Sequence, residues 1–374
     1  MQTVTADKPS GESPGARIAR EEAALREEVA AATEAFLADQ HAVLHAISPE
    51  SLALLQAISP LTAGGKKMRA LLCYWGWRAA GGSEGGREAV QAAAALEFFQ
   101  AAALMHDDII DRSDTRRGAP SAHRQFSAMH AREGLHLDGY HFGISAAILA
   151  GDLCLAFSEE LFSRACQGDP GRAARAIFNR MRTEVMAGQY LDLLEEAAGQ
   201  DHSPDVAADR ALNILRFKSA RYSIERPVML GAALAGADAD LLERLSAFAL
   251  PLGEAFQLRD DILGVFGDQQ ITGKPAGDDL REGKRTYLVA LTLAQCPAEQ
   301  RPVVNALLGD PSLGESDIGV LRGIISASGA LENTETLITE RLASALESLE
   351  SLGLEAMPAA ALRRLATAAV TRSF

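Results

Sequence analysis

Residues 89–120, "AVQAAAALEFFQAAALMHDDIIDRSDTRRGAP", join a long apolar run to a dense group of charged side chains. The alanine-rich part repeats apolar residues at helical spacing, which predicts a helix. Gln91, Glu97 and Gln100 interrupt it, and it falls short of the roughly 20 apolar residues that cross a bilayer. We therefore predict a buried core helix and no stable membrane insertion. The charges that follow are costly to bury alone, so we expect them to face water, each other or a charged ligand.

The rest of the chain repeats the same helical pattern. Residues 20–47 and 338–352 place apolar residues three and four apart, and alternation of β-branched residues is scarce. We predict an all-α fold with one helical domain at residues 18–374. Residues 1–17 contain no apolar core of the kind a signal peptide needs, and they are rich in Pro, Gly and Ser. They are expected to form a disordered N-terminal tail.

The overall charge and the cysteines restrict the function classes. Thirty-six basic residues against fifty acidic ones give a net charge of −14, which argues against nucleic acid as a partner, although it is compatible with a local basic pocket. The four cysteines show no C-x-x-C spacing, so free thiols in a reducing compartment are favoured over disulfides or a zinc site. We expect a cytoplasmic protein. The cysteines are Cys73, Cys154, Cys166 and Cys296.

The aspartates behind the apolar run form a first acidic cluster. On a helix, Asp107 and Asp111 share one face, with Asp108 beside them. Carboxylates so close repel each other and raise each other's pKa unless a cation neutralises them, and oxygen ligands suit Mg²⁺. Taken alone, this cluster is equally compatible with a solvated helix end.

A second acidic cluster lies in "GEAFQLRDDILGVFGD", residues 253–268. Asp260 and Asp261 stand in an apolar helical frame, with Gln257 one turn before them and Asp268 two turns after Asp260. Two acidic patches on two apolar helices suggest facing walls of one cavity. Since Mg²⁺ is often held by a few carboxylates plus substrate phosphates, a phosphorylated substrate would supply the remaining ligands.

Lysine usage supports a phosphorylated substrate. The chain has six lysines, and the five other than Lys8 lie in "GGKKMR", "FKSAR", "TGKP" and "EGKRT", mostly close to glycines. Compact ammonium groups in such loops are typical of phosphate contacts, and arginines add bidentate ones. Ordinary solvated loops are the alternative interpretation. The candidates are Lys66, Lys218, Lys274 and Lys284 with Arg69, Arg116 and Arg117.

These motifs, in this order, resemble those of one family. The chain is similar to the trans-isoprenyl diphosphate synthases, or polyprenyl synthetases, from about residue 25 onward. The resemblance is closest to the actinobacterial geranylgeranyl diphosphate synthase type, on "RRGAPSAH", "RYSIERPVMLGA" and the insert "SAMHAREGLHLDGYHFG". It implies a single-domain helical bundle around a central cavity, and a homodimer. The shared motifs are "GGKKMR", "HDDIID", "RRGAPSAH", "AILAGD", "GQYLDL", "FKSA", "FQLRDDILGVFGD" and "TGKPAGDDLREGKRT".

The resemblance also implies a reaction, in which an allylic diphosphate ionises, isopentenyl diphosphate attacks the cation, and loss of a proton completes the condensation. Three Mg²⁺ ions would be held on the allylic diphosphate by Asp107, Asp108, Asp111, Asp260 and Asp261. Arg116, Lys218 and Lys274 would complete that shell, with Lys218 and the aspartates as the catalytic set. Isopentenyl diphosphate would bind Lys66, Arg69, Gln100 and Arg117. Gln257 and Lys284 would be further substrate-binding residues, and Asp192, Asp278 and Asp279 would support the site from behind.

Product length in this family depends on the residues one turn or so before the first aspartate cluster. Ala103 and Ala102 are small, and Phe99 lies one turn deeper, where its ring would form the floor. We therefore expect a C20 product, geranylgeranyl diphosphate. The alternatives are a farnesyl or longer-chain synthase, a class I terpene cyclase, or a noncatalytic partner subunit. One departure from the family pattern is Gly264, which stands where many members carry a third aspartate of the second cluster, and it leaves the role of Asp268 open.

Overall fold

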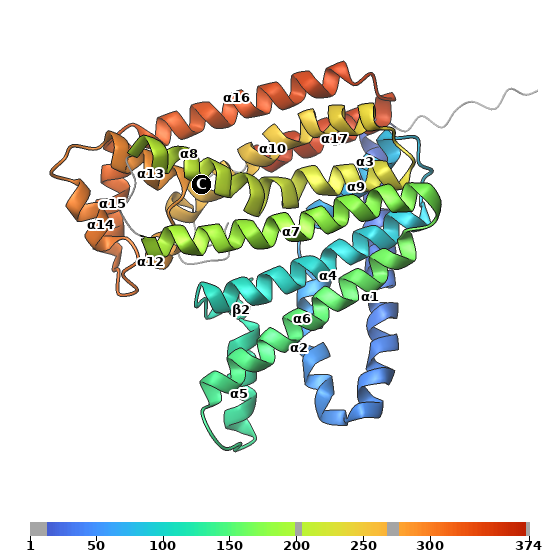
Figure 1. Ribbon diagram of the computed structural model, residues 1–374, viewed down its shortest axis with the longest axis horizontal. Helices are drawn as coiled ribbons and strands as arrows, with labels where there is room; N and C mark the ends of the chain where they lie inside the picture. Colours follow the sequence, from blue (N-terminus) through green and yellow to red (C-terminus); the bar gives the residue numbers. More distant parts are fainter. Residues whose placement is uncertain (1–12, 199–203, 268–276, 372–374) are drawn as a thin grey trace, which may run out of the picture.

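The computed structural model describes residues 13–198, 204–267 and 277–371. Almost all of these residues are helical, so the all-α prediction is confirmed (Figure 1). Within the described ranges, strands are limited to one short antiparallel hairpin. The elements are α1 (Pro14–Ile47), η1 (Pro49–Ser51), α2 (Leu52–Ala63), α3 (Met68–Ala79), α4 (Arg87–Ile110), β1 (Thr115–Arg116), β2 (Ala119–Pro120), α5 (Ala122–Arg132), α6 (Gly139–Ala165), α7 (Gly168–Ala198), α8 (Pro204–Leu215), η2 (Arg216–Glu225), α9 (Arg226–Leu234), α10 (Ala239–Phe266), α12 (Asp278–Glu282), α13 (Tyr287–Gln295), α14 (Arg301–Leu307), α15 (Glu315–Ala327), α16 (Ala330–Ser351) and α17 (Ala356–Val370).

The helices form a bundle in which α4 and α10 carry the two acidic motifs. Helix α4 packs along α6, α3 packs on α9, and α10 packs along α16 (Figure 1). Between α7 and α10 lies η2, a ten-residue π-helix. Because π-helical turns are rare and often occur at functional sites, the motif "FKSAR" stands in an unusual backbone.

Helix α4 is the buried core helix that the sequence predicts. Its residues 92–95 are four alanines with no exposed surface, so neighbouring helices approach it from all sides. Glu97, one of the polar interruptions, is buried and accepts a hydrogen bond of 2.9 Å from Nζ of Lys67. The ion pair with Lys67 thus compensates the negative charge that Glu97 buries in α4.

The N-terminal boundary differs from the expectation. Helix α1 begins at Pro14, so residues 14–17, which were assigned to the tail, are helical. Ser13 caps this helix, since its Oγ accepts a hydrogen bond of 3.3 Å from the backbone nitrogen of Ala16, and proline is favoured at the first helical position. Residues 1–12 lie outside the described ranges.

One helix of the described chain, α6, is long and apolar enough to cross a membrane by length and composition alone. Core helices of soluble proteins meet the same criterion, and α6 packs against α4 and α5 (Figure 1). No membrane insertion is therefore indicated. All four cysteines are free, as expected from their spacing.

Candidate active site

The two acidic motifs line one cavity of about 760 Å³. Asp107 and Asp111 reach it from the last turn of α4, and Asp260 and Asp261 reach it from α10. The structure therefore brings together the two clusters that lie about 150 residues apart in the sequence. Gln100 of α4 and Gln257 of α10 also line the cavity, each one or two turns before the acidic cluster of its own helix.

The three aspartates of the first cluster have different surroundings. Burial raises the pKa of Asp107, Asp111 adds to the shift, and Lys218 opposes it. Asp108 is buried and accepts a hydrogen bond of 2.8 Å from Nε of Arg116, which the β1–β2 hairpin folds back onto α4. Asp111 lies 3.2 Å from Nζ of Lys284. The cluster is thus a set of carboxylates facing cations from three other segments.

The second cluster contains a carboxylate that holds its proton unusually well. Burial raises the pKa of Asp261 to about 8, and nearby Asp279 and Asp260 add to the shift. A hydrogen bond of 2.8 Å from Nε2 of Gln257 to Oδ1 of Asp261 opposes it. A cation bound beside Asp261 would favour the ionised form of this carboxyl and so lower its pKa.

Gly264 leaves room for a carboxylate from another element. A Cβ atom at this position would lie only 1.8 Å from Oδ2 of Asp279, which belongs to α12. Asp279 therefore occupies the space that a third side chain of the α10 motif would need. Asp268, the residue whose role the sequence left open, lies outside the described ranges.

The basic residues of the cavity fall on different elements. Lys66, from the loop before α3, and Arg117, from the β1–β2 turn, both line it. The guanidinium of Arg117 lies against Gly64 and donates a hydrogen bond of 3.2 Å to the carbonyl of Leu61, which brings it to the loop that carries Lys66. Lys66 and Arg117 thus come from other segments than Lys218, which belongs to η2.

Lys218 is bound to a carboxylate of α7. Burial disfavours its charge, but Asp192 and Asp107 outweigh this effect and raise its pKa. Its Nζ donates a hydrogen bond to Asp192. This direct contact is consistent with the supporting role expected of Asp192. Arg116, Lys284 and Asp278 also line the cavity.

Some predicted residues within the described ranges, Asp108 and Arg69 among them, are not part of the cavity lining. Arg69 instead donates a hydrogen bond of 2.7 Å to Oγ of Ser223, and its guanidinium stacks 4.3 Å above the ring of Tyr222. Arg69 turns this way because η2 offers it both an acceptor and an aromatic face, and its predicted contact with isopentenyl diphosphate stays a prediction. Lys274 lies outside the described ranges. Of the three chain-length candidates, Phe99 and Ala102 are buried and Ala103 is half-buried, and none of them is part of the cavity lining.

The cavity also contains residues beyond the candidates predicted from the sequence motifs. Arg285 follows Lys284 in "EGKRT" and lines it, a position that the motif itself could have suggested. Glu196 of α7 is not part of the lining, but burial raises its pKa to about 7, and Asp192 and Asp111, which do line the cavity, contribute. The apolar wall of the cavity is made by α8, whose residues Ala211, Ile214 and Leu215 show the three-and-four spacing of an amphipathic helix.

The donor set fits a hard divalent cation. The acidic side chains that line the cavity are all aspartates, whose carboxylate oxygens can coordinate a metal ion. A bound cation would lower the pKa values of Asp107 and Asp261, which burial raises. Among the described residues, no three acidic, histidine or cysteine side chains already converge as a metal-binding group. This arrangement suits Mg²⁺ held by one or two carboxylates per ion together with water and phosphate oxygens.

Comparison with known families agrees with this geometry. The model of the polyprenyl synthetase family matches residues 52–322. This chain belongs to the polyprenyl synthetase family. The resemblance inferred from the motifs is thereby confirmed, and the synthetase is a trans-prenyltransferase, as predicted.

Curated relatives of this polyprenyl synthetase make products of different lengths. It is 35% identical over 280 residues to a geranylfarnesyl diphosphate synthase of Aeropyrum pernix, covering 74% of this chain and 80% of the relative. It is 31% identical over 315 residues to a geranylgeranyl diphosphate synthase of Sulfolobus acidocaldarius, covering 83% and 88%. A geranylgeranyl product is consistent with these relatives, but they do not fix the chain length.

Solved structures of similar proteins contain divalent metals. The geranylgeranyl pyrophosphate synthase of Corynebacterium glutamicum, complexed with isoprenyl diphosphate and magnesium, is 38% identical to this polyprenyl synthetase, with a TM-score of 0.88 over 93% of this chain and 99% of that one. A polyprenyl synthase of Caulobacter crescentus, complexed with calcium and isoprenyl diphosphate, is 29% identical, with a TM-score of 0.75 over 98% and 99%. These complexes support divalent-metal use in the family.

Proposed function

We propose that this polyprenyl synthetase condenses isopentenyl diphosphate with allylic diphosphates (dimethylallyl, geranyl and farnesyl) to give geranylgeranyl diphosphate. The observation that carries the proposal is the pair of facing acidic walls, from α4 and α10, in one cavity that also holds two separate basic sets. Lys66 and Arg117 form one set, and Lys218 with Arg116 belongs to the other. Two diphosphates require two such sets.

We propose that Asp107, Asp108, Asp111, Asp260 and Asp261 hold Mg²⁺, three ions per site. When bound, the metal supplies Lewis-acid stabilisation of the negative charge on the departing diphosphate. Arg116, Lys218 and, by resemblance, Lys274 bind the same diphosphate from the protein side. Lys284 adds a cation between Asp111 and Asp279. These groups orient the diphosphate so that it leaves toward the acidic walls.

The second substrate is placed by its own contacts. Lys66 and Arg117 bind isopentenyl diphosphate, and Gln100, which also lines the cavity, adds a contact to it. The hydroxyl of Tyr222 donates a hydrogen bond of 2.6 Å to Oε1 of Gln100, which leaves the amide NH₂ of Gln100 as its donor for a phosphate oxygen. The apolar wall from α8 keeps water away from the allylic cation.

We propose a C20 product because Ala102 and Ala103 are small and Phe99 lies below them. Phe99 is buried, with its ring centroid 5.4 Å from that of Tyr222 and 6.4 Å from that of Phe178. This aromatic group would form the floor that stops the growing chain.

One assay separates this function from its rivals. The full chain is incubated with Mg²⁺, isopentenyl diphosphate and each allylic diphosphate, and the products are identified by mass. We expect geranylgeranyl diphosphate. A cyclic hydrocarbon formed without isopentenyl diphosphate would indicate a terpene cyclase, and no product with any substrate would indicate a noncatalytic subunit.

We also propose that the protein is a cytoplasmic homodimer. The family resemblance implies the dimer, and Tyr140, Ile148 and Leu149 of α6 are apolar side chains that are 45%, 42% and 61% exposed. Burying them against a second copy would remove apolar surface from water. The free cysteines favour a reducing compartment. Light scattering coupled to size-exclusion chromatography tests the dimer, and a monomer at micromolar concentration would contradict it.

A further inference from the structure

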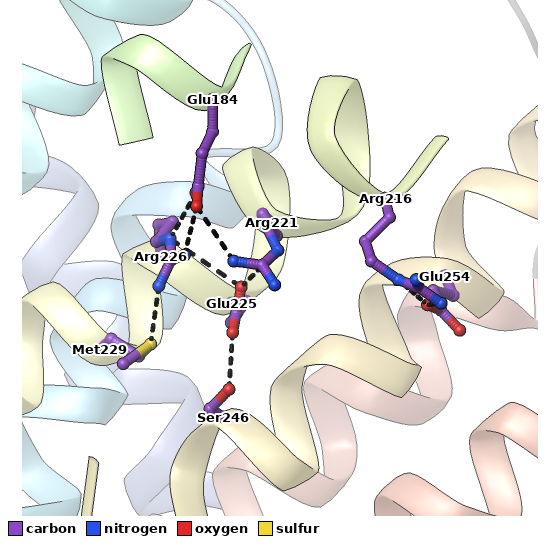
Figure 2. Close-up of polar contacts among 8 residues, drawn as sticks. All are labelled: Glu184, Arg216, Arg221, Glu225, Arg226, Met229, Ser246 and Glu254. Carbon is purple, nitrogen blue, oxygen red and sulfur yellow. Dashed lines mark hydrogen bonds and ion pairs between the residues drawn. The ribbon is translucent and has the colours of Figure 1, made fainter. Parts of the chain in front are cut away.

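The π-helix η2 has two faces with different surroundings. Tyr222 and Ser223 follow Lys218 by about one π-turn. Lys218 contacts Asp192, Tyr222 contacts Gln100, and Ser223 contacts Arg69. The other face carries Arg221 and Glu225, which take part in a group of ion pairs away from the cavity (Figure 2). The position of Lys218 in the cavity therefore depends on how η2 is held from behind.

On one side, η2 is held by α7. Glu184 accepts hydrogen bonds of 3.0 Å from Arg221 and of 2.8 and 2.9 Å from Arg226 (Figure 2). One turn later, Gly188 touches the backbone of Lys218 so closely that a Cβ there would lie 2.5 Å from its nitrogen and 2.7 Å from its Cα. One turn later again, Asp192 binds the Lys218 ammonium.

These contacts of α7 come from positions four residues apart, which share one face of a helix. An ion pair, a backbone contact and the ammonium contact thus follow one another along a single stripe. Because the middle contact is between backbones, it leaves η2 no freedom to slide without a clash.

On the opposite side, η2 is held by α10. Oγ of Ser246 donates a hydrogen bond of 2.6 Å to Glu225, and Nε of Arg216 donates one of 2.7 Å to Glu254 (Figure 2). Between them, a Cβ on Gly253 would lie 2.5 Å from the carbonyl oxygen of Ala220. The same helix carries Asp260 and Asp261 two turns further on, so η2 is fixed relative to both α7 and the second acidic cluster.

We propose that Glu184, Gly188 and Gly253 are positioning residues that set the depth of Lys218 in the active site. None of the three lines the cavity. The ion pairs of Glu184 fix the far face of η2, and the two glycines let α7 and α10 approach its backbone. This inference rests on the proposed role of Lys218 in binding the allylic diphosphate.

The test is a double-mutant cycle read by binding rather than turnover. Isothermal titration measures the affinity of the full chain for inorganic diphosphate with Mg²⁺ in the wild type, Gly188→Ala, Lys218→Ala and the double variant. A displaced charge-assisted contact predicts about a tenfold loss of affinity for Gly188→Ala. In the Lys218→Ala background, the same substitution should cost less than about twofold, because contacts acting through one residue are not additive.

Gly323→Ala is the matched control. It makes the same substitution in a helix, α15, at a position where an added Cβ meets nothing within 4 Å. Its diphosphate affinity should equal that of the wild type. An unchanged affinity in Gly188→Ala, or an equal loss with and without Lys218, would overturn the proposal.

Glu184→Gln provides a second cycle that does not introduce a clash. Loss of the carboxylate charge weakens its hold on Arg221 and Arg226 while the amide oxygen can still accept hydrogen bonds, so the fold should be retained. We expect about a threefold loss of affinity that disappears in the Lys218→Ala background. If Gly188→Ala does not fold, this cycle decides by the same criterion. Glu21→Gln, which removes the charge of a buried pair with Arg78 between α1 and α3, is its control.

The outcome is distinguishable from failure of the proposed function. A wild-type chain that binds magnesium diphosphate but forms no prenyl product would contradict the condensation and leave both cycles valid. A wild-type chain that does not bind diphosphate would remove the ligand of Lys218 and overturn the positioning role itself.

Discussion

Nζ of Lys284 lies 3.2 Å from Oδ2 of Asp111 and joins the last turn of α4 to the segment before α13. The same ammonium lies 3.5 Å from Oδ1 of Asp279, which in turn lies against Gly264 of α10. A single cation therefore connects the two acidic walls. Burial disfavours the charge of Lys284, but Asp279, Asp111 and Glu282 outweigh it and raise its pKa well above the ordinary value.

Removal of one carboxylate from either acidic wall should abolish most turnover. Asp107→Ala and Asp260→Ala are each expected to lower kcat/KM by at least about a hundredfold, since metal stabilisation of the departing diphosphate contributes several kcal/mol. Chelation of Mg²⁺ should remove activity in the wild type. Asp240→Ala, at the exposed start of the same helix as Asp260, is the control and should retain activity. Near-normal turnover of either variant, with its helical content verified by circular dichroism, would refute the two-wall site.

The two substrates should respond to different basic residues. Lys66→Ala is expected to raise the KM for isopentenyl diphosphate about tenfold, with a much smaller effect on the allylic substrate, because a charge-assisted contact to one diphosphate is lost. Lys218→Ala should show the reverse preference. Steady-state kinetics with each substrate varied in turn measures both, and equal effects on the two KM values would contradict the assignment.

The raised pKa of Asp261 predicts a pH dependence of stability in the metal-free protein. Its pKa is about 8 in the fold and near 3.8 for the ordinary side chain. Below about pH 4 both states hold the proton. As pH rises toward 8, only the unfolded state loses it, so this group lowers the free energy of unfolding over that range.

Asp261→Asn tests this prediction, because it retains the Oδ1 that accepts from Gln257 but cannot ionise. Urea unfolding in the presence of a chelator at pH 5, 6.5 and 8 should show that the difference in stability between Asp261→Asn and the wild type grows in favour of the variant as pH rises. A constant difference across this range would mean that Asp261 is already ionised in the metal-free fold.

Product length should respond to the residues beneath the first acidic cluster. Ala103→Phe or Ala102→Phe is expected to shorten the product to C15 or C10, because a ring would fill the space under the acidic wall. Phe99→Ala should lengthen it, at a cost of about 3–5 kcal/mol in stability, since its buried ring packs on Tyr222 and Phe178.

Chromatography of the dephosphorylated products reports the chain length. The α8 wall provides the contrasting variant, because Ala211 lines the cavity directly whereas the residues above do not. A product that is shortened by Ala211→Phe and unchanged by the three α4 variants would place the floor at α8.

The sequence predicted those features that depend on local spacing. Asp107 with Asp111, and Asp260 with Gln257, lie where a helical repeat places them, and their shared cavity follows once both helices are buried. Ser13 followed by proline also encodes the start of α1 locally. The Pro, Gly and Ser content of the surrounding segment instead favours a disordered tail, so composition alone predicts the wrong boundary.

Features that depend on contacts between distant segments were not predictable in this way. The π-helical backbone of η2 has no signature in "RFKSARYSIE", and the turn of Arg69 toward Ser223 requires knowing that η2 packs beside α3. Asp279 over Gly264 is a similar case, because a glycine reveals only that a side chain is missing and not which group fills the space.

The backbone of η2, which carries both Lys218 and Tyr222, has a consequence for how the two substrates affect each other's binding. In the proposed assignment, Lys218 binds the allylic diphosphate, and Tyr222, one turn away, is hydrogen-bonded to Gln100, which is assigned to isopentenyl diphosphate. A ligand that draws one of these side chains into place also fixes the other, since both belong to one rigid turn. Each substrate would then strengthen the binding of its partner, and thermodynamic reciprocity requires the two factors to be equal whichever arrives first.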